Sequence, residues 1–274
     1  MSTPASQNLT PQVVPTALLE ALRQAHRLVI LTGAGMSAES GVPTFRDAMH
    51  GLWEQFDPAE LASPEGWDAD RDRVWAWYEW RRRLVQQAQP NPGHLAIPRL
   101  ANAISRHSGH EVTVDLLTQN VDDLHERGGS KHVLHLHGSL FAPRCYLCGR
   151  EGQFSGPPPI EPIERIPPPK CKHCDGVLRP GVVWFGEGLP DQVWRHAEQL
   201  VADCDVLLVV GTSGVVYPAA RLPVMARDDG KWVAEINPTR SELSDKVHLH
   251  WQTTAATGLS KLSKALLKQL PPLS

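Results

Sequence analysis

Short runs of apolar, β-branched residues alternate along the chain with longer segments of helical period. Residues 28–32, Leu-Val-Ile-Leu-Thr, are apolar without alternation, which is typical of a strand buried on both faces. Comparable runs cover 112–118, 132–136, 206–211, 232–236 and 246–250. Helical periodicity covers 16–25, 71–89, 94–106, 192–202, 218–227 and 259–270. This alternation predicts βαβ units, and therefore an α/β fold with a Rossmann-like parallel sheet.

Two stretches interrupt the alternation. Residues 47–90 contain no run typical of a strand, so we expect an all-helical insert over the sheet. Residues 138–179 contain two proline-rich segments, 156–159 and 167–169. No helix can run through that density of proline, and we expect a small loop-rich module there. The sheet domain is then assembled from residues 1–46, 91–137 and 180–274.

A glycine-rich turn follows the first predicted strand. Gly33-Ala34-Gly35-Met36-Ser37-Ala38 matches the G-x-G-x-x-A fingerprint of dinucleotide-binding folds, whose glycines allow close approach of the backbone to a pyrophosphate. The acidic residue that normally holds the ribose, about twenty positions further on, is missing. The segment 39–46 instead carries glycine and proline, and we expect it to form a loop over the cofactor. The turn therefore predicts dinucleotide binding but disfavours a hydride-transferring dehydrogenase.

Polar or glycine residues follow four of the predicted strands at the point where each strand ends. Open α/β sheets bind ligands at the carboxyl edge of their strands, so we expect these residues to converge on one site. They are Gln119, Asn120 and Asp122 after the second strand, His137 and Gly138 after the third, Gly211, Thr212 and Ser213 after the fourth, and Asn237 after the fifth.

The sequence has thirteen histidines, so most must be structural or lie on the surface. His135 and His137 lie two apart in a predicted strand and should point to the same face. His137, followed by Gly138, is expected at the lip of the sheet, whereas His135 is expected to pack within it. A neutral imidazole at that lip is suited to proton abstraction at about pH 7.

Four of the five cysteines form two C-x-x-C pairs, Cys145 with Cys148 and Cys171 with Cys174, separated by the 22 residues 149–170. Four thiolates with no open position are typical of one structural Zn²⁺ ion, which makes 138–179 a zinc-binding module. The alternatives are two redox pairs or a chance pattern. Cys204 is expected to be an inert core thiol, and His173 to be exposed because it would be a fifth ligand.

Composition narrows the class of protein. A 41% hydrophobic and 21% charged content is ordinary for a globular domain, and a net charge of -3 gives no reason to expect nucleic acid or a membrane surface as partner. The polar N-terminus has neither the basic nor the apolar region of a signal peptide, and no apolar run could span a bilayer. We therefore expect a soluble cytoplasmic protein.

Taken together, these motifs resemble the sirtuins, the NAD-dependent protein lysine deacylases, from about Leu28 to Leu270. The resemblance rests on the order of Gly33-Ala-Gly-Met-Ser37, Gly41-Val-Pro-Thr-Phe-Arg46, Thr118-Gln-Asn-Val-Asp122, Leu136-His-Gly138, the paired cysteines, Arg179-Pro-Gly-Val-Val-Trp-Phe-Gly-Glu187 and Gly211-Thr-Ser213. It implies an NAD-binding sheet domain with NAD as co-substrate, one structural zinc ion, and an acyl-lysine peptide in the cleft between sheet domain and zinc module.

The resemblance also implies roles for residues. NAD would be held by Gly33, Ala34, Gly35, Ser37, Thr44, Phe45, Arg46, Gln119, Asn120, Asp122, Gly211, Thr212, Ser213, Asn237 and, by position, Ala255. Nicotinamide would leave near Phe45, Asn120 and Asp122 as the acyl oxygen attacks the ribose. His137 would be the general base, and the products would be nicotinamide and O-acyl-ADP-ribose. The peptide would be clamped as an added strand by Val183, Trp184, Phe185 and Gly186 and by the segment after Ser213.

Tyr78 and Arg81 lie three apart on one face of a predicted helix and resemble the Y-x-x-R motif of the sirtuin class that removes succinyl and malonyl groups. A guanidinium can hold a carboxylate at two points, and a phenol can add a hydrogen bond. Ala62 would leave room for the longer acyl chain. The alternative is an aromatic stripe in the core beside solvated arginines.

Two residues depart from the family pattern near the expected peptide cleft. Gly181 stands where a larger residue is common, and Gly214 where a second serine is common, which puts peptide affinity in question. The leading function is a desuccinylase or demalonylase that also removes acetyl groups. The alternatives are a plain deacetylase, a mono-ADP-ribosyltransferase and a non-catalytic NAD-binding adaptor. The sequence does not define the protein substrates or the oligomeric state, although a monomer is consistent with it.

Overall fold

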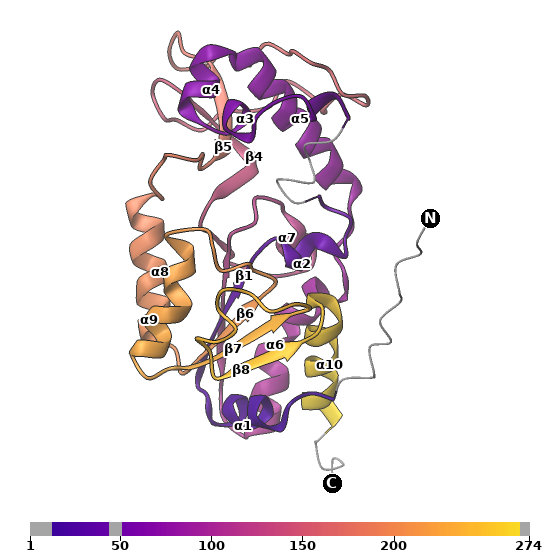
Figure 1. Ribbon diagram of the computed structural model, residues 1–274, viewed down its shortest axis with the longest axis vertical. Helices are drawn as coiled ribbons and strands as arrows, with labels where there is room; N and C mark the ends of the chain where they lie inside the picture. Colours follow the sequence, from indigo (N-terminus) through magenta and orange to yellow (C-terminus); the bar gives the residue numbers. More distant parts are fainter. Residues whose placement is uncertain (1–12, 44–50, 269–274) are drawn as a thin grey trace.

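A six-stranded, fully parallel sheet forms the lower part of the molecule (Figure 1) in the computed structural model, which describes residues 13–43 and 51–268. Its strands run in the order β3-β2-β1-β6-β7-β8. They are β1 (Arg27–Thr32), β2 (Thr113–Thr118), β3 (Leu134–His135), β6 (Val206–Val210), β7 (Trp232–Asn237) and β8 (Leu249–Gln252). The order reverses between β1 and β6, and this switch point is where doubly wound sheets bind ligands. The predicted Rossmann-like fold is confirmed.

Helices cover both faces of this sheet because β1 buries alternate side chains on opposite sides. Leu28 and Ile30 pack against α1 (Thr16–Gln24), α6 (Pro92–Ser108) and α10 (Ala255–Lys268), whereas Val29 and Leu31 pack on the side of α8 (Asp191–Asp203) and α9 (Leu222–Asp228). Figure 1 shows α8 and α9 together on one side of the sheet and α10 on the other. Two apolar cores therefore hold the sheet rigidly. In the described part of the chain, no helix combines the length and apolar character needed to cross a membrane.

Several predicted elements need correction. The strand predicted at 132–136 is only the two residues of β3, because only Leu117 and Thr118 of β2 pair with it. The strand predicted at 246–250 is displaced to β8, which pairs with the end of β7. The helix predicted at 218–227 is a 3-10 turn, η2 (Ala219–Arg221), followed by α9. The apolar pattern locates these segments, but the exact bounds of each strand depend on the partner strand with which it pairs.

The upper part of the molecule combines the helical insert with the cysteine module (Figure 1). It contains η1 (Gly51–Trp53), α3 (Pro58–Leu61), α4 (Pro64–Ala69), α5 (Arg71–Gln87) and the antiparallel pair β4 (Gly138–Cys145) and β5 (Leu178–Val182). One apolar cluster joins Trp67 and Trp77 of the insert to Leu140, Leu178 and Trp184. The two inserts therefore share one core, while the domain limits given above stay a prediction.

A buried ion pair fastens α5 to the cysteine module. The Arg82 guanidinium contacts the Glu79 carboxylate at 2.6 Å, and both side chains are almost fully buried. Arg82 also donates to the Gly156 carbonyl at 3.1 Å and lies 3.7 Å from the centre of the Phe154 ring. A buried charge pair is tolerated only when its remaining donors find partners, and the proline-rich loop supplies them.

Gly181 is required by the pairing of β4 with β5. A Cβ atom at this position would lie 1.7 Å from the Ala142 carbonyl oxygen, so no larger residue fits without moving the strand. The departure from the family pattern at 181 is therefore explained by the local approach of two backbones.

Candidate functional site

The glycine turn packs directly against the loop that follows β6. Gly35 N donates to the Gly211 carbonyl at 2.7 Å, and Gly33 N donates to the Val210 carbonyl at 3.0 Å. A Cβ atom on Gly35 would lie 2.8 Å from the Gly211 Cα, and Gly211 itself has φ of 62°. Glycine is therefore needed at 33, 35 and 211 to bring two strand ends together at the switch point.

Three polar side chains, joined by two hydrogen bonds through Ser37, lie above this turn. Ser37 Oγ, from α2 (Gly35–Ala38), donates to Asp122 Oδ2 at 2.8 Å, and Asn120 Nδ2 donates to Ser37 Oγ at 3.1 Å. All three side chains are buried. Burial raises the pKa of Asp122, while hydrogen bonds from Leu124 N and Ser37 oppose that effect. The two hydrogen bonds through Ser37 therefore hold the Asn120 amide and the Asp122 carboxylate close together at the sheet edge.

His137 lies on the same sheet edge, and one of its two ring nitrogens is already hydrogen-bonded to the backbone. Its Nδ1 is 3.0 Å from the Gln119 carbonyl, which can only accept, so Nδ1 carries the proton and Nε2 keeps its lone pair. Burial lowers the pKa of His137 below its ordinary value, against the effect of the Gln119 bond. The prediction that His137 lies in the same strand as His135 is wrong, because β3 ends at His135 and His137 lies in the turn between β3 and β4. The imidazole is nevertheless neutral and oriented, as a general base requires.

His135 has a different environment. Its Nδ1 lies 3.0 Å from the Asn120 carbonyl, and its Nε2 lies 2.7 Å from the Glu126 carboxylate. Burial lowers the pKa of His135, but the Glu126 carboxylate and hydrogen bond raise it by more, so the net shift is upward. His135 is therefore anchored at both nitrogens and holds the Asn120 segment from behind.

The other predicted NAD residues lie along the same edge. Gln119 Nε2 donates to Thr212 Oγ1 at 3.1 Å, and Asn237 Nδ2 donates to the Thr212 carbonyl at 2.8 Å. Ser213 is exposed. Ala255 begins α10, where its carbonyl packs against Gly93 of α6.

The structure thus brings together Gly33, Ala34, Gly35, Ser37, Gln119, Asn120, Asp122, His137, Gly211, Thr212, Ser213 and Asn237, with Ala255 at the neighbouring start of α10. Thr44, Phe45 and Arg46 lie outside the described residues. The roles assigned to individual residues stay predictions.

Sequence reasoning missed a layer of support beneath the site. Thr32 Oγ1 donates to Thr118 Oγ1 at 2.8 Å, His125 Nε2 lies 2.9 Å from Thr32 Oγ1, and Asn120 N donates to Thr118 Oγ1 at 3.1 Å. A threonine at the last position of two neighbouring strands was the available signal. His125 follows in α7 (Leu124–Arg127), but its distance from Thr32 in sequence gave no indication of the contact.

Tyr78 and Arg81 lie on α5, on the side of the shared core. Tyr78 is buried, and its Oη accepts a hydrogen bond from Trp184 Nε1 at 3.1 Å. Burial raises the pKa of Tyr78 to about 12, with the nearby Arg81 charge opposing this. The Arg81 guanidinium is 5.8 Å from the centre of the Tyr78 ring. Burial lowers the pKa of Arg81, and this effect is opposed by Tyr78 and by the Asp122 carboxylate.

The predicted peptide segment connects the two parts of the molecule. Val183 N donates to the His137 carbonyl at 2.9 Å, and Phe185 N donates to the Ala62 carbonyl at 2.9 Å. Trp184 is buried, whereas Phe185 and Gly186 are exposed. The segment therefore lies between His137 and the helical insert.

The four predicted zinc ligands converge. Their sulfur atoms all lie within 4.8 Å of one another, with Cys145 and Cys174 at 3.5 Å and Cys148 and Cys171 at 3.8 Å. A Zn–S bond of about 2.3 Å places the sulfurs of a tetrahedral site about 3.8 Å apart. Backbone N–H groups of Cys148, His173 and Gly176 donate to three of these sulfurs. The donor set fits one structural Zn²⁺ ion with no open position. His173 is exposed and Cys204 is buried, as predicted.

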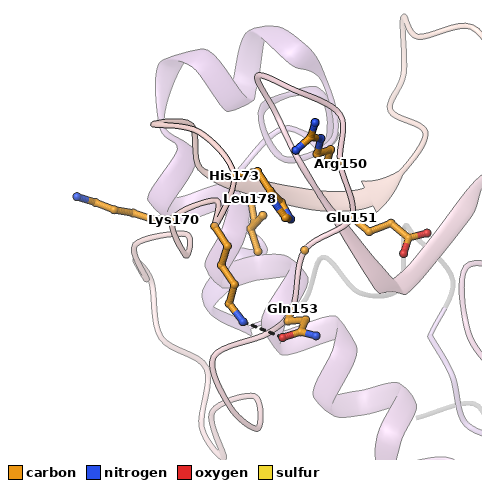
Figure 2. Close-up of a pocket in the computed structure, with 8 residues that line it drawn as sticks. Arg150, Glu151, Gln153, Lys170, His173 and Leu178 are labelled. Carbon is orange, nitrogen blue, oxygen red and sulfur yellow. Dashed lines mark hydrogen bonds between the residues drawn. The ribbon is translucent and has the colours of Figure 1, made fainter.

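A hollow also lies on the cysteine module itself (Figure 2). Its lining includes Arg150, Glu151, Lys170, His173 and Leu178, and Lys172 donates to Gln153 at 2.9 Å on its rim. None of the predicted NAD or peptide residues lines it. The sheet edge is therefore the candidate active site.

Comparisons with known proteins agree with this site. Residues 33–218, more than half of the chain, match the model of the Sir2 family. The NAD-dependent protein deacylase 1 of Pseudomonas aeruginosa is 55% identical over 224 residues, which cover 81% of this chain and 87% of the relative. The structure of a Sir2 homologue bound to NAD has a TM-score of 0.80 at 43% identity, covering 93% of this chain and 94% of that chain. A Sir2 protein bound to a deacetylated peptide and 3′-O-acetyl ADP-ribose has a TM-score of 0.72 at 28% identity, covering 91% and 97%.

The chain belongs to the Sir2 family. The family recognised from the sequence is confirmed, and at the level of the family so is an NAD-dependent protein deacylase. The names of these relatives specify a deacylase without specifying the acyl group.

Zinc removal tests the role of the cysteine cluster. We expect about one zinc per chain by elemental analysis, and we expect Cys171→Ser to lose the metal and to unfold the shared core at lower temperature, because the ligands hold together the loops packed on it. The buried Cys204→Ser variant is the control and should keep its zinc. A Cys171→Ser protein with full zinc content would contradict the assignment.

Proposed function

We propose that this chain uses NAD to remove acyl groups from protein lysine and prefers acyl groups that end in a carboxylate, such as succinyl and malonyl. The products are nicotinamide and O-acyl-ADP-ribose. The observation that carries the proposal is the placement of Arg81 on α5, with its guanidinium 5.8 Å from the centre of the Tyr78 ring. The Asp122 carboxylate of the sheet edge also raises the pKa of Arg81, which supports a carboxylate reader close to the polar residues of that edge.

NAD binding is supported by the construction of the switch point. The turn at Gly33–Gly35 and the loop at Gly211–Thr212 are held against each other at the ends of β1 and β6 by the bonds of Gly33 N to Val210 and of Gly35 N to Gly211. Gln119 and Asn237 fix Thr212 from two sides, which holds that loop in one conformation. Pre-ordered polar groups of this kind bind a dinucleotide without loss of loop entropy.

His137 supplies the base. The chemistry implied by the family resemblance needs a group that accepts a proton from a ribose hydroxyl while the acyl group passes from lysine to ADP-ribose. Nε2 of His137 has a free lone pair because the Gln119 carbonyl holds Nδ1. Asn120 and Asp122, fixed by Ser37, lie on the same edge, where nicotinamide would leave.

The acyl chain is recognised by Arg81 and Tyr78 of α5. Arg81 can hold a carboxylate at two points, and Tyr78 adds a hydroxyl one helical turn away. The buried surroundings strengthen such a charge-assisted pair relative to water. An acetyl group has no carboxylate and gains nothing from either side chain, so it is the poorer substrate. The exposed Phe185 and the 183–186 backbone are placed to clamp the peptide, which comes from an acyl-lysine protein.

Removal of the His137 imidazole separates binding from chemistry. We expect His137→Ala to lower kcat by at least about 100-fold, because general-base catalysis contributes that much, while NAD binding measured by calorimetry persists. His132→Ala, on the exposed approach to β3, is the control. Unchanged turnover in His137→Ala would rule out the general-base role.

The pH profile tests the state of the same imidazole. Because burial lowers the pKa of His137, the neutral base persists as the pH falls, and it is lost only below the ordinary histidine value of 6.5. We therefore expect the acid limb of kcat/KM on a succinyl peptide to have its midpoint below 6.5. A midpoint at about 7 or above would mean that a histidine with raised pKa controls the rate.

Arg81→Met tests acyl recognition. We expect the kcat/KM for a succinyl-lysine peptide to fall by about 30-fold or more, because a buried carboxylate loses its charged partner, while that for the matched acetyl peptide changes little. Arg71→Met, exposed on the first turn of α5, is the matched control. Equal losses on the two peptides would sink the assignment of an acidic-acyl reader.

A further inference from the structure

One hydrogen bond joins the acyl-reading helix to the peptide-clamping segment. Trp184 Nε1 donates to Tyr78 Oη at 3.1 Å across 106 positions of sequence. Both side chains are buried, with exposed fractions of 2% for Trp184 and 5% for Tyr78. Trp184 follows β5, which lies beside α5 in the upper part of the molecule (Figure 1). Water therefore does not compete for this contact.

The chemistry of the two groups fixes the direction of the bond. An indole N–H can only donate, so the phenol oxygen must accept. The phenol then has its own proton left to donate, and the indole excludes orientations in which that proton points toward Trp184. In the described part of the chain, no acceptor is found for it. The Tyr78 hydroxyl can therefore still donate one hydrogen bond, and it lies near the Arg81 charge.

Trp184 is itself held by a charged clamp. The Arg179 guanidinium lies 3.3 Å from the centre of the Trp184 ring and contacts the Glu187 carboxylate at 2.5 and 2.9 Å. The same carboxylate accepts a hydrogen bond from Trp184 N at 2.9 Å. Ring and backbone of Trp184 are therefore fixed by one ion pair, and the indole cannot turn away from Tyr78 without breaking it.

From these contacts we propose that Trp184 is a positioning residue for acyl selection. Its indole N–H holds the Tyr78 hydroxyl so that the phenol proton is presented to the carboxylate of an acyl chain beside Arg81. The inference rests on the proposed preference for acidic acyl groups. Val183 and Phe185 flank Trp184 in the segment proposed to clamp the peptide. A change in the order of that segment therefore also changes the position of the Tyr78 hydroxyl.

The test replaces the indole by a smaller aromatic ring that cannot donate. With Trp184→Phe, we expect the ratio of kcat/KM for succinyl to acetyl peptides to fall about threefold to tenfold, the effect of one buried neutral hydrogen bond. The loss should come from the succinyl peptide alone. The ratio is measured on one preparation, so it does not depend on the fraction of folded protein. Trp80→Phe, on α5, is the matched control and should leave the ratio unchanged.

A double-mutant cycle shows whether Trp184 acts through Tyr78. In the Tyr78→Phe background, Trp184→Phe should change the succinyl-to-acetyl ratio by less than about twofold, because the hydroxyl that it positions is gone. Glu187→Gln, which weakens the clamp while the indole stays, should lower the ratio in the wild-type background. It replaces Trp184→Phe if that variant does not fold.

The outcomes separate this inference from the proposed function. A wild-type enzyme without preference for the succinyl peptide would contradict the proposed function itself. A wild-type preference that persists in Trp184→Phe, or in Glu187→Gln where that variant is used, would overturn only the role of Trp184. Equal losses on both peptides would also overturn it, and so would a Trp184→Phe effect on the ratio that is as large in the Tyr78→Phe background as in the wild type, since either result indicates a merely structural residue.

Discussion

The contact between the Gly33–Gly35 turn and Gly211 is the constraint on which the rest of the site depends. The two backbones lie so close that Gly35 N donates to the Gly211 carbonyl at 2.7 Å, and no Cβ fits between them. This contact fixes the ends of β1 and β6 at the point where strand order reverses. Thr212 then lies within reach of Gln119 and Asn237, so the loops after β2 and β7 are ordered by the same contact.

The residues proposed for acyl selectivity and those proposed for cofactor binding are positioned by different cores. The sheet and its helices position Ser37, Asn120 and Asp122, whereas the shared core of the helical insert and cysteine module positions Tyr78 and Trp184. The two parts approach each other where Val183 donates to the His137 carbonyl and where the Arg81 charge acts on Asp122. The four cysteine thiolates would hold one zinc ion with no open position for chemistry, and such an ion would stabilise the loops of the cysteine module.

Much of the sheet edge could be predicted because its signals are local. A buried apolar strand followed by G-x-G-x-x-A, and polar residues after successive strands, lead to one edge once the sheet is parallel. Cysteine spacing likewise predicted the convergence of the four sulfurs. Contacts between distant residues could not be predicted in this way. The Trp184–Tyr78 bond and the Arg82–Gly156 bond depend on how two inserts pack, and β3 is short because its partner offers only two residues.

We propose above that this Sir2 protein consumes NAD to remove acidic acyl groups from lysine. The most direct measurement is mass spectrometry of one reaction that contains equal amounts of matched acetyl-, succinyl- and malonyl-lysine peptides, with and without NAD. We expect NAD-dependent loss of the succinyl and malonyl groups ahead of the acetyl group, with one nicotinamide and one O-acyl-ADP-ribose for each lysine freed. Faster loss of acetyl, or ADP-ribose attached to protein without any O-acyl-ADP-ribose, would contradict it.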